Sequence, residues 1–114
     1  MPTPAEVLRA AAARVRRGYT KGCYQDADGN VCAEGALICE AHGIESIADE
    51  LDSSAVGLRM FQAAEGTLNA YLRTLDPTLP TYGTAIWNDR EDTTAEDVAA
   101  AMEKAAAIWE EQKG

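Results

Sequence analysis

The segment Thr93–Trp109, with the sequence TTAEDVAAAMEKAAAIW, decides the fold class because it is the clearest helix in the chain. Thr93 and Glu96 have the spacing of a capping box, in which each side chain bonds the backbone N–H of the other residue at the start of a helix. Apolar residues then recur every three or four positions along one face, at Val98, Met102, Ala105 and Trp109. The segment therefore predicts an amphipathic helix that packs against other helices.

The start of the chain predicts another helix of this kind. Thr3 and Glu6 repeat the capping-box spacing, and Pro4 stands at the first helical position, where its missing N–H is not needed. The helix should end near Arg17, because Gly18 follows it and the arginines before it suit the negative end of the helix dipole.

Two further helical regions are predicted between these. One covers Cys32–Ala41 and is closed by Gly43. The other covers Ser53–Leu75, where Gly57 and Gly66 leave open whether the region is one helix or two.

Together these patterns predict an all-α fold, a small bundle of four to five helices with a short hairpin or loop insertion near residues 19–31. Asp28-Gly29 is the turn signal of that insertion, and Cys23 and Tyr24 would pair with Val31 across it. A chain of 114 residues fits a single globular domain, residues 1–114. Ten residues are predicted to converge in its interior: Leu8, Val15, Leu37, Phe61, Leu68, Leu72, Trp87, Val98, Met102 and Trp109.

The charge of the chain is strongly negative and unevenly distributed. Nineteen acidic and ten basic residues give a formal charge of −9, which repels phosphate backbones and disfavours direct nucleic-acid binding. Residues 1–24 nevertheless carry a net charge of +4, so the remainder carries −13. We expect the basic first helix to dock on the acidic body of the protein, and a basic patch for a partner is the alternative.

The location predicted from the sequence is the cytoplasm. No apolar run approaches the length of a membrane span, and the first residues lack the pattern of a signal peptide. Three cysteines cannot all pair within the chain, which favours reduced thiols.

All three cysteines and the only histidine lie in one stretch, which raises the possibility of a metal site. Cys23, Cys32, Cys39 and His42 are spaced Cys-x8-Cys-x6-Cys-x2-His, close to the Cys-x8-Cys-x5-Cys-x3-His pattern of one class of zinc finger. Cys32 and Cys39 would lie about 10 Å apart along one helix, too far to reach one tetrahedral ion easily. Packing in the core is the favoured interpretation of these two cysteines, and zinc is the alternative.

The same stretch fails as a calcium site. Asp26, Asp28 and Asn30 match the first three ligands of an EF-hand loop, but Val31 replaces the required glycine and Leu37 the required glutamate. The run is therefore interpreted as turn chemistry, in which short polar side chains bond nearby backbone N–H groups.

No catalytic signature is evident. Cys39 and His42 lie on one predicted helical face, whereas a Cys–His nucleophile pair usually comes from separate elements, with a third residue that orients the histidine. The sequence predicts no catalytic residue, no cofactor and no enzymatic activity.

The segment Ile86-Trp87-Asn88-Asp89 has two interpretations. In the favoured one, Ile86 and Trp87 anchor in the core while Asn88 and Asp89 turn the chain. In the other, Trp87, Asn88 and Asp89 are candidates for partner binding, because tryptophan is over-represented among interface hot spots.

Four motifs resemble those of a family of small uncharacterised actinobacterial and actinophage proteins. They are Gly22-Cys23, the run Cys32-Ala-Glu-Gly-Ala-Leu37, the segment Ile86-Trp-Asn-Asp89 and the helix start Thr93–Val98. The resemblance implies no known reaction, only that certain residues matter to a shared fold: Gly35, Ala36, Trp87, Asn88 and Asp89. Gly35 would permit a close approach between the second helix and its neighbour.

The leading hypothesis is a non-enzymatic, acidic protein-binding module of bacterial or phage origin that acts on a host or regulatory protein. The first alternative is a small zinc-binding or thiol-dependent protein that uses Cys23, Cys32, Cys39 and His42. The second alternative is an acidic mimic of nucleic acid, suggested by the charge of −13 after Tyr24.

Overall fold

The structure, a computed structural model, describes residues 2–47 and 55–113. Five helices follow one another in this part of the chain: α1 (Pro4–Arg17), α2 (Ala33–His42), α3 (Ala55–Leu75), α4 (Thr84–Asn88) and α5 (Ala95–Lys113). The described residues form no strand, so the predicted all-α fold is confirmed. None of these helices is long and apolar enough to cross a membrane.

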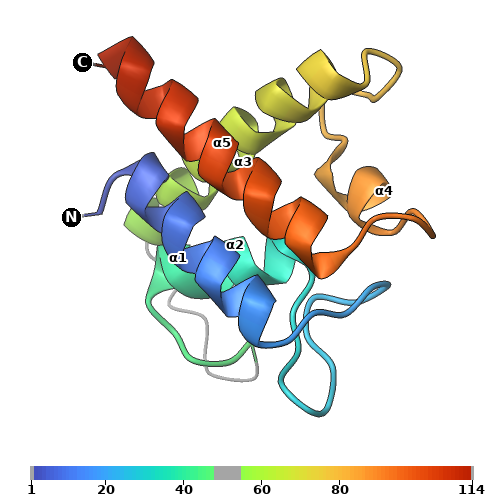
Figure 1. The fold of residues 1–114 in the computed structure, drawn as a ribbon. Coiled ribbons are helices and arrows are strands. Elements are labelled where there is room, and N and C mark those ends of the chain that lie inside the picture. The colour runs from blue at the N-terminus through green and yellow to red at the C-terminus, as the bar shows by residue number, and fades with distance from the viewer. Residues whose placement is uncertain (1, 48–54, 114) are drawn as a thin grey trace.

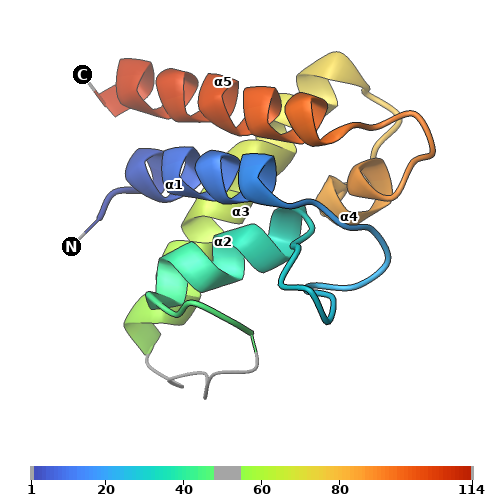
Figure 2. The same cartoon turned by 60° about the horizontal axis from the view of Figure 1, so that its bottom comes forward.

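Helices α1 and α5 lie side by side and antiparallel, and they make the most extensive contact between two helices (Figures 1 and 2). Their facing surfaces are rich in alanine, which lets the two backbones approach closely. The buried alanines on these helices are Ala5, Ala11, Ala12, Ala99, Ala101, Ala105 and Ala106.

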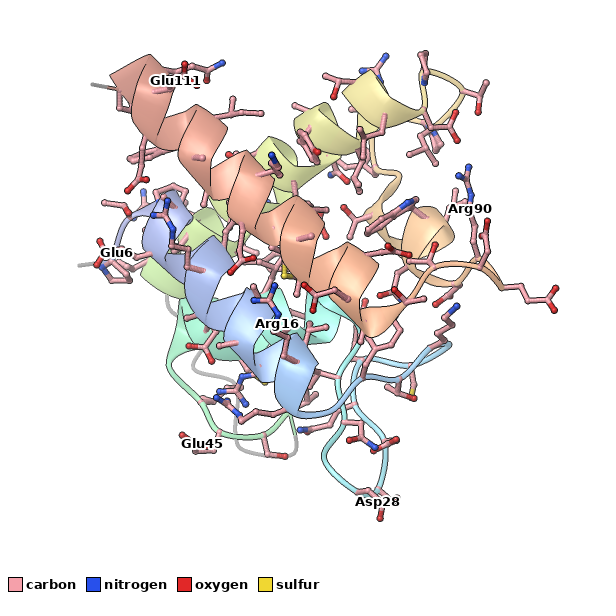
Figure 3. All side chains as sticks on the ribbon, viewed as in Figure 1. Glu6, Arg16, Asp28, Glu45, Arg90 and Glu111 are labelled. Carbon is pink, nitrogen blue, oxygen red and sulfur yellow. The ribbon has the colours of Figure 1, made fainter. Side chains whose placement is uncertain are left out.

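Ion pairs run along the outer edge of the α1–α5 contact. Arg16 bonds Glu96 and Glu103, both at 2.8 Å, and Arg9 bonds Glu110 at 2.6 Å. Figure 3 shows Arg16 between the two helices. The prediction that the basic first helix docks on the acidic body is therefore confirmed.

The interior lies between this helix pair and the helices α2 and α3, which cross beneath it (Figure 2). Seven of the ten predicted core residues are fully or almost fully buried: Leu8, Val15, Leu37, Leu68, Leu72, Val98 and Met102. The other three, Phe61, Trp87 and Trp109, are partly buried and pack against the margin of this core. Aromatic side chains thus border the interior, and aliphatic side chains fill it.

The predicted helix starts are confirmed at α1 and wrong by one residue at α5. Thr3 and Glu6 form the capping box of α1. At α5 the box is formed by Thr94 and Asp97. The Thr94 hydroxyl accepts from Asp97 N at 3.1 Å, and the Asp97 carboxylate accepts from Thr94 N at 3.0 Å. Thr93 is buried instead and donates its hydroxyl to a backbone carbonyl before the helix. Of two adjacent threonines, tertiary packing selects the second as the cap.

The region Ser53–Leu75 is a single helix from Ala55 onward, without a break at Gly57 or Gly66. Its predicted start at Ser53 lies outside the described residues. Helix α2 begins one residue after the predicted position, because Cys32 is its N-cap.

The insertion near residues 19–31 is a loop stabilised by isolated bridges rather than a hairpin of strands. Val31 pairs with Tyr19 and with Gln25, so the predicted pairing of Cys23 and Tyr24 with Val31 is wrong. One backbone bond, from Val31 N to the Gly18 carbonyl at 3.0 Å, joins the end of the loop to the end of α1. The path of the loop therefore depends partly on its contact with α1, and local turn signals in the sequence do not predict that contact.

The interpretation of Asp26–Asn30 as turn chemistry is confirmed. Asp26 Oδ1 accepts from the backbone N–H groups of Asp28 at 3.0 Å and Asn30 at 2.9 Å. Gly29 completes the turn with a φ of 87°, a conformation that side chains disfavour. A further hydrogen bond, from the Asn30 side chain, lowers the pKa of the Asp26 carboxyl most, and the two backbone bonds lower it as well.

Candidate functional site

Asn88, on the inner side of α4, joins three parts of the chain. Its side-chain Oδ1 accepts from the backbone N–H of Ala33, the first residue of α2, at 2.9 Å. Its Nδ2 donates to Asp89 Oδ1 at 2.9 Å, and its carbonyl accepts from the Tyr19 hydroxyl at 2.8 Å. Asn88 is only 1% exposed. It therefore fixes α4 to the start of α2 and to the insertion loop.

The residues beside Asn88 extend this junction. Asp89 is exposed, and its Oδ1 also accepts from Gly22 N at 3.1 Å. Burial and, to a smaller extent, the nearby Asp89 carboxylate raise the pKa of Tyr19 to about 12. The Tyr19 hydroxyl therefore stays protonated and acts as a hydrogen-bond donor. Trp87 is partly buried against the core, and its carbonyl accepts from the Thr93 hydroxyl at 2.8 Å.

A cavity of about 380 Å³ opens beside this junction, and we call it the α4 cavity. The insertion loop, the first turn of α2 and helix α4 all contribute to its wall, with Gly22, Cys23, Tyr24, Cys32, Glu34, Ala85, Asn88 and Asp89. Its size is within the range of small-ligand sites. No lysine or arginine among the described residues lines it.

Cys32 closes the inner wall of the α4 cavity as the N-cap of α2. Its Sγ accepts from Gly35 N at 3.3 Å, in the place where a serine or aspartate oxygen usually stands. Burial raises the pKa of the Cys32 thiol, which keeps it protonated and weakly nucleophilic. Cys23, in contrast, lines the same cavity and is exposed.

Gly35 permits a close approach, as predicted, but the neighbour is the insertion loop and not a helix. A Cβ at this position would lie 2.0 Å from the Tyr24 carbonyl oxygen. That oxygen also accepts from Cys32 N at 3.2 Å, so the loop and the first turn of α2 are in direct backbone contact. The glycine is therefore needed to form the wall of the cavity.

The residues of the zinc hypothesis do not gather at one point. Cys39 is buried on α2, seven residues or about 10 Å beyond Cys32 along the helix. His42 lies at the far end of α2, against Gly57 of α3. Within residues 2–47 and 55–113, no three side chains of the ligand types His, Cys, Asp and Glu are placed to hold a metal ion.

A pair of carboxyl groups joins α2 to α3 next to the α4 cavity. Glu34, which lines the cavity, shares a side-chain hydrogen bond with Glu65. Burial, then this bond and the charge of Glu34, raise the pKa of Glu65 to about 8, so the Glu65 carboxyl keeps its proton near neutral pH. Glu65 Oε2 is buried and has no hydrogen-bond partner within residues 2–47 and 55–113.

Exposed apolar side chains lie on α4, on the connection just before it and on the insertion loop. Ile86 on α4 is 54% exposed, Tyr24 on the loop 52% and Tyr82 on the connection 78%. Ala85, next to Ile86 on α4, is also exposed and lines the α4 cavity together with Tyr24. We call these four residues the α4 face. Figure 1 shows α4 projecting at one side of the molecule, away from the N- and C-termini.

The favoured prediction that both Ile86 and Trp87 anchor in the core is wrong for Ile86, whose side chain is 54% exposed, whereas Trp87 packs against the core. Trp87, Asn88 and Asp89 were the candidates for partner binding, and the structure places the first two largely inside. The exposed Ile86 belongs to the same motif, but nothing local indicates that a five-residue helix turns it outward. Glu34 and Glu65 are far apart in the sequence and carry no signal of their pairing.

The comparisons with known proteins identify a family. The family of unknown function DUF6197 matches residues 1–108. The chain belongs to this family. No curated protein and no solved structure matches the chain.

Membership of DUF6197 covers more of the chain than the four motifs did, since it includes the segment around residues 45–82 that they left out. The match thus spans the whole described core and the α4 cavity. It attaches no reaction or ligand to DUF6197. The actinobacterial or actinophage origin suggested by the motifs stays a prediction.

Proposed function

We propose that this DUF6197 protein is a non-enzymatic protein-binding module that docks through the α4 face. In this proposal it acts in the cytoplasm on a host or regulatory protein of a bacterium or phage. The observation that carries the proposal is the group of exposed apolar side chains on a helix whose polar groups are all directed inward.

The α4 face has the composition of a binding surface. Tyr24 and Tyr82 are large, semi-rigid side chains of a type enriched at interfaces, and Ile86 is an exposed aliphatic side chain on the helix itself. The helix beneath is held in place by Asn88 and by Thr84, whose backbone N–H and hydroxyl both donate to Asn69 Oδ1. A surface that is already ordered loses little conformational entropy when a partner binds.

The alternative of an acidic nucleic-acid mimic has less support. A mimic would present a row of unpaired negative charges to a basic groove. The row on α5, formed by Glu96, Glu103 and Glu110, is instead paired with arginines of α1. These bonds lower the pKa of each carboxyl and neutralise much of its field.

The thiol-dependent alternative also has less support. A reactive cysteine needs an electropositive setting that favours the thiolate. The α4 cavity places the Cys32 thiol beside Glu34 and Asp89, and its pKa is raised.

The proposal is tested by site-specific photo-crosslinking in the cells from which the gene derives. A photoreactive residue replaces Ile86 in one variant and Leu58, an aliphatic residue on α3 with a similar exposure of 52%, in the control variant. We expect discrete adducts with another protein from position 86 and none from position 58. Equal labelling from both positions, or no adduct from position 86, would contradict a docking role for the α4 face.

A further inference from the structure

The α4 cavity is lined by acidic side chains and, among the described residues, by no basic ones. Glu34 and Asp89 line it without any described lysine or arginine. Two cations that adjoin its lining residues in the sequence, Lys21 and Arg90, bond groups outside it. Lys21 Nζ donates to two backbone carbonyls of the connection between α4 and α5, and Arg90 bonds Asp76 at 2.7 Å.

The Asp89 carboxylate is held in a fixed orientation. Gly22 N and Asn88 Nδ2 both donate to its Oδ1, at 3.1 and 2.9 Å. Its Oδ2 accepts no hydrogen bond from the described residues. One oxygen therefore positions the group, and the other remains available to a donor that enters the cavity.

The Glu34 side of the cavity is also short of donors. Glu34 meets the carboxyl group of Glu65, which lies outside the cavity lining and whose Oε2 is buried with no hydrogen-bond partner among the described residues. Two acidic side chains from two helices thus meet with no cation between them. A positive group placed beside Glu34 would gain a charge-assisted hydrogen bond to its carboxylate.

We propose that the α4 cavity receives an arginine side chain of the protein partner, so this inference rests on the proposed function. A guanidinium group is planar, carries five N–H donors and can bond carboxylates on two sides at once. It also stacks on aromatic rings, and Tyr24 supplies one at the wall of the cavity. The apolar residues beside this arginine in the partner would contact Ile86 and Tyr82 of the α4 face.

A peptide titration tests the recognition of arginine. The probes are the tripeptide acetyl-Leu-Arg-Leu-amide and the same peptide with citrulline, which has the shape of arginine without its charge. Two-dimensional amide NMR should show concentration-dependent shifts of Gly22, Glu34 and Asp89 with the arginine peptide. We expect the citrulline peptide to bind at least about tenfold more weakly, as for the loss of a charge-assisted contact. Equal binding of the two peptides would overturn the inference.

Two matched variants locate the contact. Glu34→Gln removes one charge from the cavity but can still bond Glu65, so we expect it to fold and to lose at least about fivefold in affinity for the arginine peptide. Glu111→Gln removes the same charge from the exposed end of α5, which lies far from Arg90 and α4 in Figure 3, and should leave the affinity unchanged. Equal losses in both variants would mean that the peptide senses only net charge, and the inference would fall.

The two proposals fail in different ways. If the photo-crosslinks from position 86 form equally well in wild type and Glu34→Gln, and the arginine peptide shifts no amide of the cavity, the docking function stands and the arginine inference is wrong. If Glu34→Gln abolishes the crosslinks while the Glu111→Gln variant retains them, the arginine inference is supported. If no crosslink forms from position 86 in the wild type, the proposed function itself is wrong.

Discussion

Replacement of Asn88 should destabilise the whole domain, because this residue joins α4, α2 and the insertion loop. In Asn88→Ala the backbone N–H of Ala33 loses its only side-chain acceptor in a buried position, and Asp89 loses a donor. An unpaired buried polar group costs about 1 to 3 kcal/mol, and the missing side-chain atoms leave a small cavity. We therefore expect a loss of about 2 to 4 kcal/mol in the free energy of unfolding, a large part of the stability of a domain of this size.

The isosteric variant Asn88→Asp separates hydrogen bonding from packing. Its carboxylate can still accept from Ala33 N, but it cannot donate to Asp89 and it places two negative charges side by side. We expect it to be destabilised at neutral pH and to recover part of the loss near about pH 5, where one of the two groups can hold a proton.

Urea denaturation followed by far-ultraviolet circular dichroism measures both variants. Gln112→Ala, on the exposed end of α5, is the control and should change the free energy of unfolding by less than about 0.5 kcal/mol. An Asn88→Ala variant as stable as this control would refute the role of the Asn88 side chain in holding α4 to the start of α2.

Three further outcomes follow from the core, the cavity wall and the carboxyl pair. Leu72→Ala, at a side chain 1% exposed, should lower the free energy of unfolding by about 2 to 5 kcal/mol in urea denaturation, and an unchanged midpoint would contradict the core. Gly35→Ala should cost about 1 to 3 kcal/mol, because its Cβ would lie 2.0 Å from the Tyr24 carbonyl oxygen; a melting temperature equal to that of wild type would contradict this contact. Burial and then Glu34 raise the pKa of Glu65 to about 8, so Glu65 keeps its proton in the native state, whereas the unfolded state loses it above about pH 4.5. The free energy of unfolding should therefore fall as the pH rises toward 8. Glu65→Gln should remove this slope, so relative to wild type it should gain about 1 kcal/mol of stability between about pH 5 and pH 8, a value reduced for solvent screening. Denaturation curves that keep the wild-type slope would refute the raised pKa of Glu65.

Elements whose ends are set by neighbouring residues were predictable from the sequence. The capping box of α1 and the Asp26 turn follow from side chains that bond a backbone N–H two to four residues away. The error at the start of α5 has the opposite cause. Thr93 and Thr94 are equivalent in local terms, and only the carbonyl of Trp87, supplied by the fold, distinguishes them.

The candidate site was predictable only in part, for the same reason. The motif around Asn88 and the need for Gly35 were recognisable, although the partner of Gly35 was not. The pairing of Glu34 with Glu65 depends on how α2 and α3 cross, and the exposure of Ile86 depends on which side of α4 is held by Asn88. Neither the crossing nor the orientation of a single helical turn is encoded within one stretch of sequence.

The short length of α4 makes its internal bonds informative about function. A helix of five residues has no independent stability, because the cost of nucleating a helix exceeds the gain from one turn. The chain nevertheless holds this turn firmly through Thr84 at its start and Asn88 at its end, both 1% exposed. The only side chains that α4 leaves well exposed are the small Ala85 and the large aliphatic Ile86. A structural role would be served as well by a polar residue at position 86, so the rigid display of an apolar side chain on the helix that lines the α4 cavity supports the proposed docking function.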